Sequence, residues 1–412
     1  MSSASAAASS PRQRDEFIDF MRGFSLVIVV VWHWVFTIIV WTPRGPSPTS
    51  PLGYTRGMWF ITWFFQVLPL FFFVGGYAHR MVWAKVRLSG GGYWQFVSGR
   101  MRRLLIPCLS LLVTWILIGV VVVAFFNVNA QWMRGAVLLI VSPLWFIAVY
   151  LVLVLIAPIM LGLHKRFGPV VIVVMAGLVA LVDVGRFAHD VNSVSLVNLV
   201  LVWGLCHQLG FFYGPLVEAD RIWYWTMALG GGFALTGLVL TRIYPLSMVG
   251  VPGDRISNMS PPTLCIVALC FFQVGIALLL RPWILRKLAE PKWAERNDVI
   301  NRFALPLFLF HTTGYAIAFA ILYAFGYRAP AQPTMDWWLQ RPAFLLLPML
   351  CTLPVIFIFG RKWITPKPTP VPAPETLGPT GEPVSAEEAD RRLREAEAGT
   401  GEPILLGQDQ VW

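Results

Sequence analysis

Residues 14–41 read RDEFIDFMRGFSLVIVVVWHWVFTIIVW, a charged start followed by a long apolar run that contains one histidine. On an α-helix, Arg22 and His33 are about 20° apart around the axis, and together with Asp15 and Asp19 they fall within an arc of roughly 60°. At about 1.5 Å per residue, His33 lies roughly 16 Å beyond Arg22, which is mid-bilayer if the helix enters near Arg22. An ionisable side chain at that depth is a functional candidate by default. The alternative is a histidine that only packs against a neighbouring helix.

The composition of the chain places it among membrane proteins. Of its 412 residues, 57 % are hydrophobic and only 13 % are charged, more apolar surface than a soluble domain needs. The five cysteines lie in or beside apolar stretches and form no CxxC pair, which argues against disulfides and zinc sites. The net charge of +11 belongs mainly to particular loops. It therefore indicates orientation and anionic partners rather than binding to nucleic acid.

Ten apolar stretches each approach the roughly 20 residues that a bilayer requires. They cover about 24–41, 58–77, 104–126, 143–163, 169–184, 195–214, 223–244, 261–280, 303–325 and 342–360. Lys and Arg are concentrated in the loops after the second and the eighth stretch, whereas the loops of the opposite side carry one or two each. The positive-inside rule then places both termini in the cytoplasm. We therefore predict an all-α polytopic membrane protein, a bundle of about ten transmembrane helices.

The two ends of the chain differ from this bundle. Residues 1–13 are small and polar and are expected to be disordered, and no signal-peptide cleavage site follows the first apolar stretch, which therefore stays as a helix. From residue 364 onward, prolines alternate with small residues and a charged segment follows. This pattern is typical of an extended linker. We expect a transmembrane domain over 14–363 and a disordered cytoplasmic tail over 364–412, to which we assign no chemistry.

Few ionisable side chains fall within or beside the apolar stretches. They are His33, Asp183, His207 and His311, with Glu218 close to the end of the sixth stretch. A buried neutral imidazole is well suited to take a proton from a sugar or lipid hydroxyl near pH 7. No Ser or Cys beside a base stands out as a nucleophile, and the sequence has no HExxH, P-loop or EF-hand pattern. We therefore predict neither a metal site nor an NTP site.

A basic loop follows the second apolar stretch and carries Arg80 and the cluster Arg100, Arg102 and Arg103. One interpretation is topology alone, because inside loops are basic in any case. The other is that these guanidinium groups bind the phosphates of an anionic cytosolic donor, whose acyl chain reaches inward. The two interpretations are compatible.

Five segments, in this order along the chain, resemble motifs of the acyltransferase-3 family of integral membrane acyltransferases. They are RDEFIDFMRGFSLVIVVVWHW (14–34), PLFFFVGGYAHR (69–80), RMRRLLIP (100–107), PLWFIAVYLVLVLIAP (143–158) and FALPLFLFHTTGY (303–315). The resemblance covers about residues 14–360 and holds in order as well as content. Two positions depart from it: Gly75 stands where the family usually has serine, and Phe308 stands where tyrosine is common.

The resemblance implies a bundle of ten or eleven helices in the inner (plasma) membrane. It would move an acetyl or other acyl group from cytosolic acyl-CoA, with acetyl-CoA the first expectation, to a hydroxyl of an envelope glycolipid or glycan. His33 would be the catalytic base or a covalent acyl relay, and Arg22 would position the donor or hold the network around the histidine. His311, with Asp19 and Trp145, would lie on the acceptor side. Because only a cytoplasmic tail follows the helices, a lipid-linked acceptor is favoured.

The competing class is a transporter for lipids or sugars. Such a protein could use His33 and Asp183 as a proton relay. Against it stand the missing internal repeat and the missing pair of Gly-Pro interrupted helices, and a channel would need a filter that the sequence does not offer. Labelled acetyl-CoA separates the classes, since a transporter would leave the label on CoA.

Overall fold

The computed structural model of this protein describes residues 15–42, 45–126, 128–189, 191–251, 253–328, 330 and 332–366. Within these ranges ten helices are long and apolar enough to cross a membrane, which confirms the prediction of an all-α polytopic membrane protein. The segments predicted to be disordered, 1–13 and most of 364–412, lie outside the described residues.

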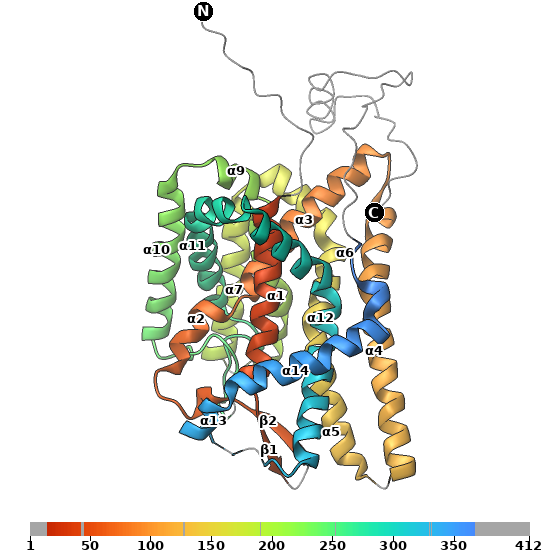
Figure 1. Ribbon diagram of the computed structural model, residues 1–412. Coiled ribbons are helices and arrows are strands. Elements are labelled where there is room, and N and C mark those ends of the chain that lie inside the picture. The colour runs from red at the N-terminus through yellow and green to blue at the C-terminus, as the bar shows by residue number, and fades with distance from the viewer. Residues whose placement is uncertain are drawn as a thin grey trace, which may run out of the picture.

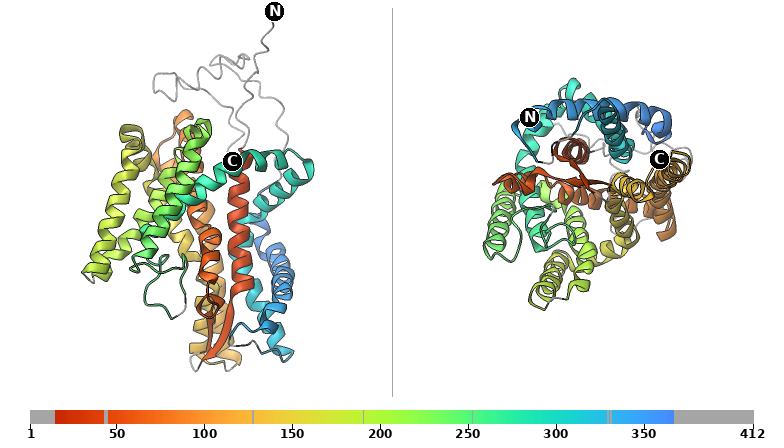
Figure 2. Two further views of the ribbon diagram at one scale, coloured as in Figure 1. Left: turned by 90° about the vertical axis from the view of Figure 1, so that its left-hand side faces the viewer. Right: turned by 90° about the horizontal axis from the view of Figure 1, so that it is seen from below.

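The first half of the chain builds the centre of the bundle and its first flank (Figure 1). Its elements are α1 (Glu16–Phe36), β1 (Ile38–Thr42), β2 (Gly45–Thr49), α2 (Thr62–Phe65), α3 (Leu68–Leu88), α4 (Tyr93–Phe126), α5 (Ala130–Val141), α6 (Leu144–Phe167) and α7 (Val170–Ala188). Helix α1 contacts α3, α11, α12 and α14, so that it lies inside the bundle, as the view from below also shows (Figure 2).

The second half of the chain forms the other flank of the bundle and includes α12, the helix against which α1 packs most extensively. Its helices are α8 (Asn198–Gly210), α9 (Tyr213–Glu218), α10 (Arg221–Leu240), α11 (Leu264–Leu288), α12 (Pro291–Ala324), α13 (Met335–Leu339) and α14 (Arg341–Val355). Short 3-10 or π turns precede α2 and α8 and follow α14, and they extend those spans. Helices α10 and α11 form one closely packed pair and α12 and α14 another.

The first helix is shifted relative to the predicted stretch 24–41. It begins at Glu16, where the Asp15 side chain accepts a hydrogen bond from Ile18 N at 3.0 Å as an N-cap, and it ends at Phe36. Residues 38–42 instead form β1, which pairs antiparallel with β2 from Ile38↔Thr49 to Thr42↔Gly45. Four consecutive β-branched residues from Thr37 favour an extended backbone, and the prolines from position 43 onward cannot continue a helix.

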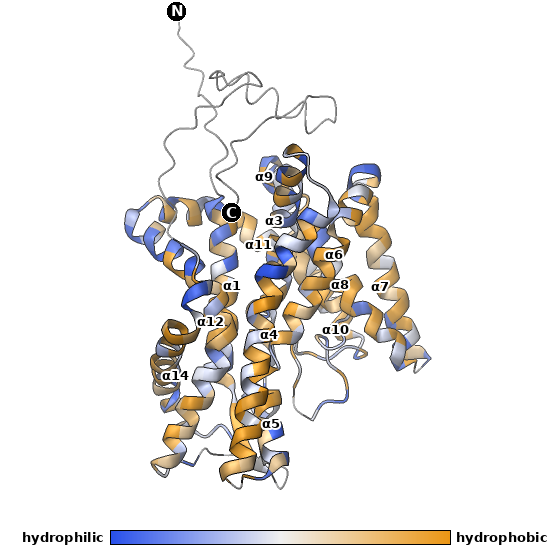
Figure 3. Ribbon diagram, turned by 90° about the vertical axis from the view of Figure 1, so that its right-hand side faces the viewer, coloured by the Kyte–Doolittle hydropathy of each residue, from blue (hydrophilic) through white to orange (hydrophobic). Residues whose placement is uncertain are grey.

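The outer helices expose apolar side chains on the surface that a bilayer would cover. Only 11 % of the most apolar window of α4 and 17 % of that of α7 is buried inside the protein. Hydrophobic colour dominates both helices, as Figure 3 shows. Large apolar side chains such as Val173 and Phe233 are 70 % and 75 % exposed. In water such a surface would aggregate, whereas lipid chains solvate it.

The first and the last described residues lie at one end of the bundle. Arg22, near the start of α1, bonds to Asn301, and Arg302 beside it pairs with the backbone of Thr365. We call this the basic end: it holds the start of α1, helix α9, and the loops 89–92 and 289–290 (Figure 1). An even number of spans places both ends of the described chain on one side. That this side faces the cytoplasm stays a prediction.

Candidate active site

Two imidazole rings face each other between α1 and α12. His33 Nδ1 lies 3.2 Å from His311 Nε2, and the ring centroids are 5.0 Å apart. His311 Nδ1 lies 2.7 Å from the carbonyl oxygen of Phe308, so that this nitrogen must carry a proton and donate. In a neutral pair, His311 Nε2 is then the acceptor and His33 Nδ1 the donor. This leaves the lone pair of His33 on Nε2, the atom that can act as a base.

Two further hydrogen bonds join the two segments on the C-terminal side of His33. The indole Nε1 of Trp34 donates to the backbone oxygen of His311 at 2.9 Å. The hydroxyl of Tyr315 donates to the backbone oxygen of Thr37 at 3.1 Å. Because these bonds join the residues beside the pair, the helices cannot slide without breaking them. The imidazoles are therefore preorganised.

A second contact joins the two helices towards the basic end. Arg22 donates from Nε and Nη2 to Asn301 Oδ1 at 3.0 and 2.8 Å, and it pairs with Asp19 at 2.9 Å. Asn301 also donates to the backbone oxygen of Asp19 at 3.0 Å. Asn301 is not among the site residues predicted from the sequence. Its signal was the spacing, because Asn301 precedes His311 by ten residues, nearly the spacing of Arg22 and His33 on the parallel helix α1.

A cavity of about 330 Å³ opens among α1, α3, α4, α6 and α12. Four arginines line it: Arg22, Arg100, Arg103 and Arg302. The rest of its wall is mainly apolar, with Leu26, Phe71, Phe146 and Phe308 among the residues that line it. The cavity therefore combines anion-binding forks with apolar walls. The histidine pair lies deeper: His33 follows the lining residue Leu26 by seven residues, about 10 Å along α1.

The other predicted site residues lie outside this cavity wall. Arg80 donates to the backbone oxygen of Phe211 at 2.6 Å, and Arg102, next to the lining residue Arg103, is itself not part of the wall. Trp145 packs on Trp203 in the core, with 6.4 Å between ring centroids. Of the four arginines proposed to bind the donor, the structure brings Arg100 and Arg103 together with Arg22.

Tyr150 is a member of the cavity wall that sequence reasoning did not select. A β-carbon on Gly75 would lie 2.8 Å from Cε2 of Tyr150, closer than two carbons can approach. The glycine that replaces the usual serine thus makes room for the phenol ring. Gly75 on α3 and Tyr150 on α6 therefore fit together in space, which could not be read from either motif alone.

A second imidazole pair lies between α3 and α8. His79 Nδ1 is 2.8 Å from His207 Nε2, both rings are fully buried, and the ring of His79 lies 5.0 Å from that of Tyr150. His79 Nε2 and His207 Nδ1 have no hydrogen-bond partner among the described residues. Gly76 and Gly210 let the two helix backbones touch, since a β-carbon on either would collide with the facing helix. The sequence pointed to His207 only, because the second apolar stretch was predicted to end at residue 77.

Asp183 is buried and holds elements together. Its carboxylate accepts hydrogen bonds from Asn198 Nδ2 at 2.9 Å, the Tyr244 hydroxyl at 3.0 Å and Leu264 N at 2.8 Å. These donors come from α8, the loop after α10 and the start of α11. Burial next to this carboxylate raises the pKa of Tyr244 well above its usual range, so the phenol stays a donor. None of these three hydrogen bonds reaches α1 or α12, the helices of His33 and His311, whereas a proton relay shared with His33 would need a path between them.

Within the described ranges, no group of three or more His, Cys, Asp or Glu side chains is placed to hold a metal ion. The polar side chains that the structure places in and beside the cavity are imidazoles, guanidinium groups and the Tyr150 phenol.

Comparison with known proteins bears on this arrangement. No curated protein and no solved structure matches the chain. A family model described as an acyltransferase domain matches residues 15–355, which include α1 with His33, the arginine-lined cavity and α12 with His311. The match extends from the N-cap of the first helix to the end of α14. The chain therefore belongs to the acyltransferase-3 family and is a multi-pass membrane acyltransferase.

Proposed function

We propose that this membrane acyltransferase takes its acyl group from a cytosolic acyl-CoA, acetyl-CoA in the first instance. The acceptor would be a hydroxyl of an envelope glycolipid or glycan, and the enzyme would reside in the inner (plasma) membrane. The observation that carries the proposal is the His33–His311 pair, whose hydrogen bonds leave a basic nitrogen beyond an arginine-lined cavity.

The cavity supports an anionic donor. Arg22, Arg100, Arg103 and Arg302 line it, and phosphate oxygens accept paired hydrogen bonds from guanidinium forks. The bonds of Arg22 to Asn301 hold that side chain in place before a ligand arrives, which lowers the entropy lost on binding. The apolar part of the wall then suits the pantetheine arm and a short acyl group.

The imidazole pair supports attack by a hydroxyl. His33 Nε2 takes the hydroxyl proton as the acceptor oxygen bonds to the thioester carbonyl carbon. The carbon–sulfur bond then breaks, and the thiolate leaves with a proton returned by the imidazolium. As His33 gains charge, its Nδ1–H can move towards His311 Nε2 at 3.2 Å, which spreads the charge over two rings. In this order of steps, His33 acts as the general base. The alternative mechanism, to be tested beside it, passes through a covalent acyl–His33 intermediate.

The test uses purified protein, acetyl-CoA labelled in the acetyl group, and lipids extracted from the native membrane. We expect label to move from CoA to the lipid or glycan fraction, and to be released again by mild alkali as an ester is. The His33→Ala variant serves as the control for adventitious transfer. Label that stays on CoA in the presence of every native acceptor fraction would contradict the proposed donor, and alkali-stable label would contradict a hydroxyl acceptor. Label on the acid-quenched protein, lost in His33→Ala, would favour the covalent variant.

A further inference from the structure

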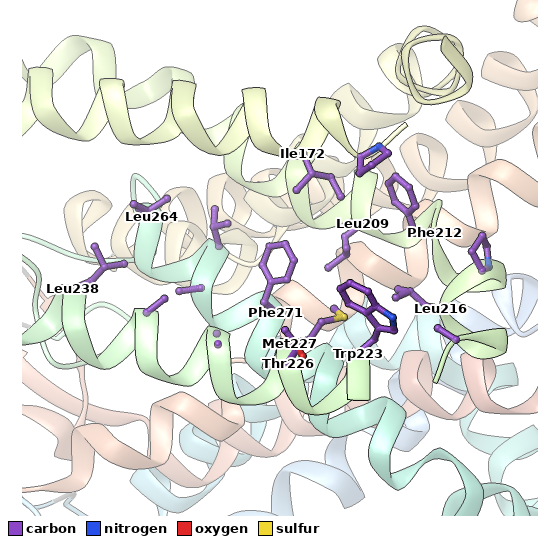
Figure 4. A pocket seen from close by; sticks show the side chains of 18 of the residues that line it. Ile172, Leu209, Phe212, Leu216, Trp223, Thr226, Met227, Leu238, Leu264 and Phe271 are labelled. Carbon is purple, nitrogen blue, oxygen red and sulfur yellow. The ribbon is translucent and has the colours of Figure 1, made fainter. Parts of the chain in front are cut away.

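A long apolar groove runs along α10 over a floor made by α11, and the start of α7, the end of α8 and α9 line it towards the basic end. Its volume is about 950 Å³. Figure 4 shows its walls, with Ile172 on one side, Trp223, Met227 and Leu238 on the other, and Phe271 behind. It shares no lining residue with the arginine-lined cavity and contains none of the predicted site residues. The groove is therefore a separate feature from the candidate active site.

The groove is long enough to hold a lipid chain, because it exceeds the hydrocarbon depth of one leaflet. The residues of α10 that line it run from Trp223 to Leu238, a length of about 22 Å at 1.5 Å per residue. One leaflet of a bilayer is about 15 Å of hydrocarbon, half of the roughly 30 Å core. A helix of the same length, about 10–12 Å wide, would occupy on the order of 2,000 Å³, about twice the volume of the groove. An acyl chain fits along the groove, whereas a helix could enter only in part.

Small residues of α10 create the space. Gly230 and Gly237 line the groove, and a β-carbon at either would meet nothing within 4 Å. Gly231 lies beside them but serves packing, because a β-carbon there would collide with the backbone of α11 at Phe272. The two open glycines are thus not required for contact between the helices. Their lack of side chains keeps the groove empty of protein.

Positive charge gathers where the groove meets the basic end. Lys165 and Arg166, both exposed, precede the lining residue Pro169, and Arg221 precedes Trp223 by two positions. Arg80 reaches the same corner, since its Nη1 lies 4.0 Å from the β-carbon position of Gly214, next to the lining residue Pro215. Two exposed acids, Glu218 and Asp220, lie just before Arg221. The four cations and two anions at this end of the groove leave a net charge of +2.

We propose that the α7–α10 groove is a binding site for an anionic phospholipid. Its acyl chain would lie along α10 and its phosphate headgroup at the basic end, among Arg80, Lys165, Arg166 and Arg221. The apolar walls exclude a polar ligand, and the charge at one end sets the direction of the lipid. The site does not depend on the proposed donor or acceptor, because it lies apart from the arginine-lined cavity.

The test fills the groove without disturbing the helices. Gly230→Leu and Gly237→Leu place a side chain in open space inside it, and Gly177→Leu on exposed α7 is the matched control, because its β-carbon also meets nothing within 4 Å and lies outside the groove. The proteins are reconstituted in nanodiscs of phosphatidylcholine with one quarter phosphatidylglycerol. Lipids that stay bound after gentle detergent extraction are then counted by native mass spectrometry, with thermal unfolding as the check on folding.

We expect wild type and Gly177→Leu to retain phosphatidylglycerol, and the groove variants to lose affinity on the order of tenfold, since each buried methylene that is displaced weakens binding. Lys165→Gln with Arg166→Gln should keep the chain bound but reduce the preference for phosphatidylglycerol over phosphatidylcholine. Equal retention by Gly230→Leu and Gly177→Leu would overturn the site, because the lipid would then be ordinary annular lipid. A wild-type dimer that Gly230→Leu dissociates would also overturn it and make the groove a helix interface.

Discussion

Replacing the two facing histidines, singly and together, tests the central inference most directly. The variants are His33→Ala, His311→Leu and the double substitution. His33→Ala removes the base itself. His311→Leu leaves the base but removes the acceptor that holds His33 Nδ1–H at 3.2 Å and can share the charge that develops in the reaction.

The expected sizes follow from these roles. General-base assistance is typically worth about 10²–10⁴-fold, or roughly 3–5 kcal/mol of barrier, so His33→Ala should lower kcat by that factor. A lost hydrogen-bond partner in a buried site costs about 1–3 kcal/mol, so His311→Leu should lower kcat by about 5–150-fold. If the rings act as one unit, the double variant should be no slower than His33→Ala, because effects within one catalytic unit are not additive.

The assay follows acetyl transfer from labelled acetyl-CoA under saturating donor, with thermal unfolding and membrane insertion measured for each variant. Folding should change little, since the half-buried His33 gives up few hydrogen bonds, of which the one to His311 crosses between helices. Near-normal transfer by His33→Ala would refute the mechanism and would mean that this residue only packs between the helices. A double variant whose loss equals the product of the single losses would show that the rings act independently, which would refute the shared charge.

Three further outcomes follow from the structure. Arg103→Gln should raise KM for the acyl-CoA at least about tenfold, because a guanidinium fork on a phosphate is lost, while Arg102→Gln, at a neighbouring position outside the cavity wall, should change it by less than about threefold; equal changes would mean that these arginines only set the topology. Cysteines introduced at Gly92 in the basic-end loop and at Ser47 in β2 should differ in intact cells, with only the latter reacting with an impermeant thiol reagent, and the reverse pattern would invert the predicted topology. Gly210→Ala should lower the free energy of unfolding by about 1–3 kcal/mol or prevent insertion, because its methyl group would collide with a backbone carbonyl of α3; unchanged thermal unfolding would contradict the close α3–α8 contact.

Much of the architecture could be predicted from the chain alone. Spanning a bilayer requires about 20 apolar residues, so the number of spans and the helical class are local properties that hydropathy reveals. The spacing of Arg22 and His33 on one helix face is local in the same sense, because a helix repeats every 3.6 residues. His311 could also be selected, as an ionisable residue in an apolar stretch.

Tertiary structure decided which of these residues meet, because packing between helices depends on partners hundreds of positions away. The spacing of Asn301 and His311 gains meaning only because α12 places the Asn301 side chain 2.8 Å from that of Arg22, and the tautomer of His33 depends on a carbonyl of another helix through His311. The fit of Tyr150 beside Gly75 likewise exists only between α3 and α6. The sequence by itself determined a membrane bundle with a buried histidine on its first helix. Only the packed helices decided which nitrogen of that histidine is free to act, because hydrogen bonds made across helix contacts fix its proton.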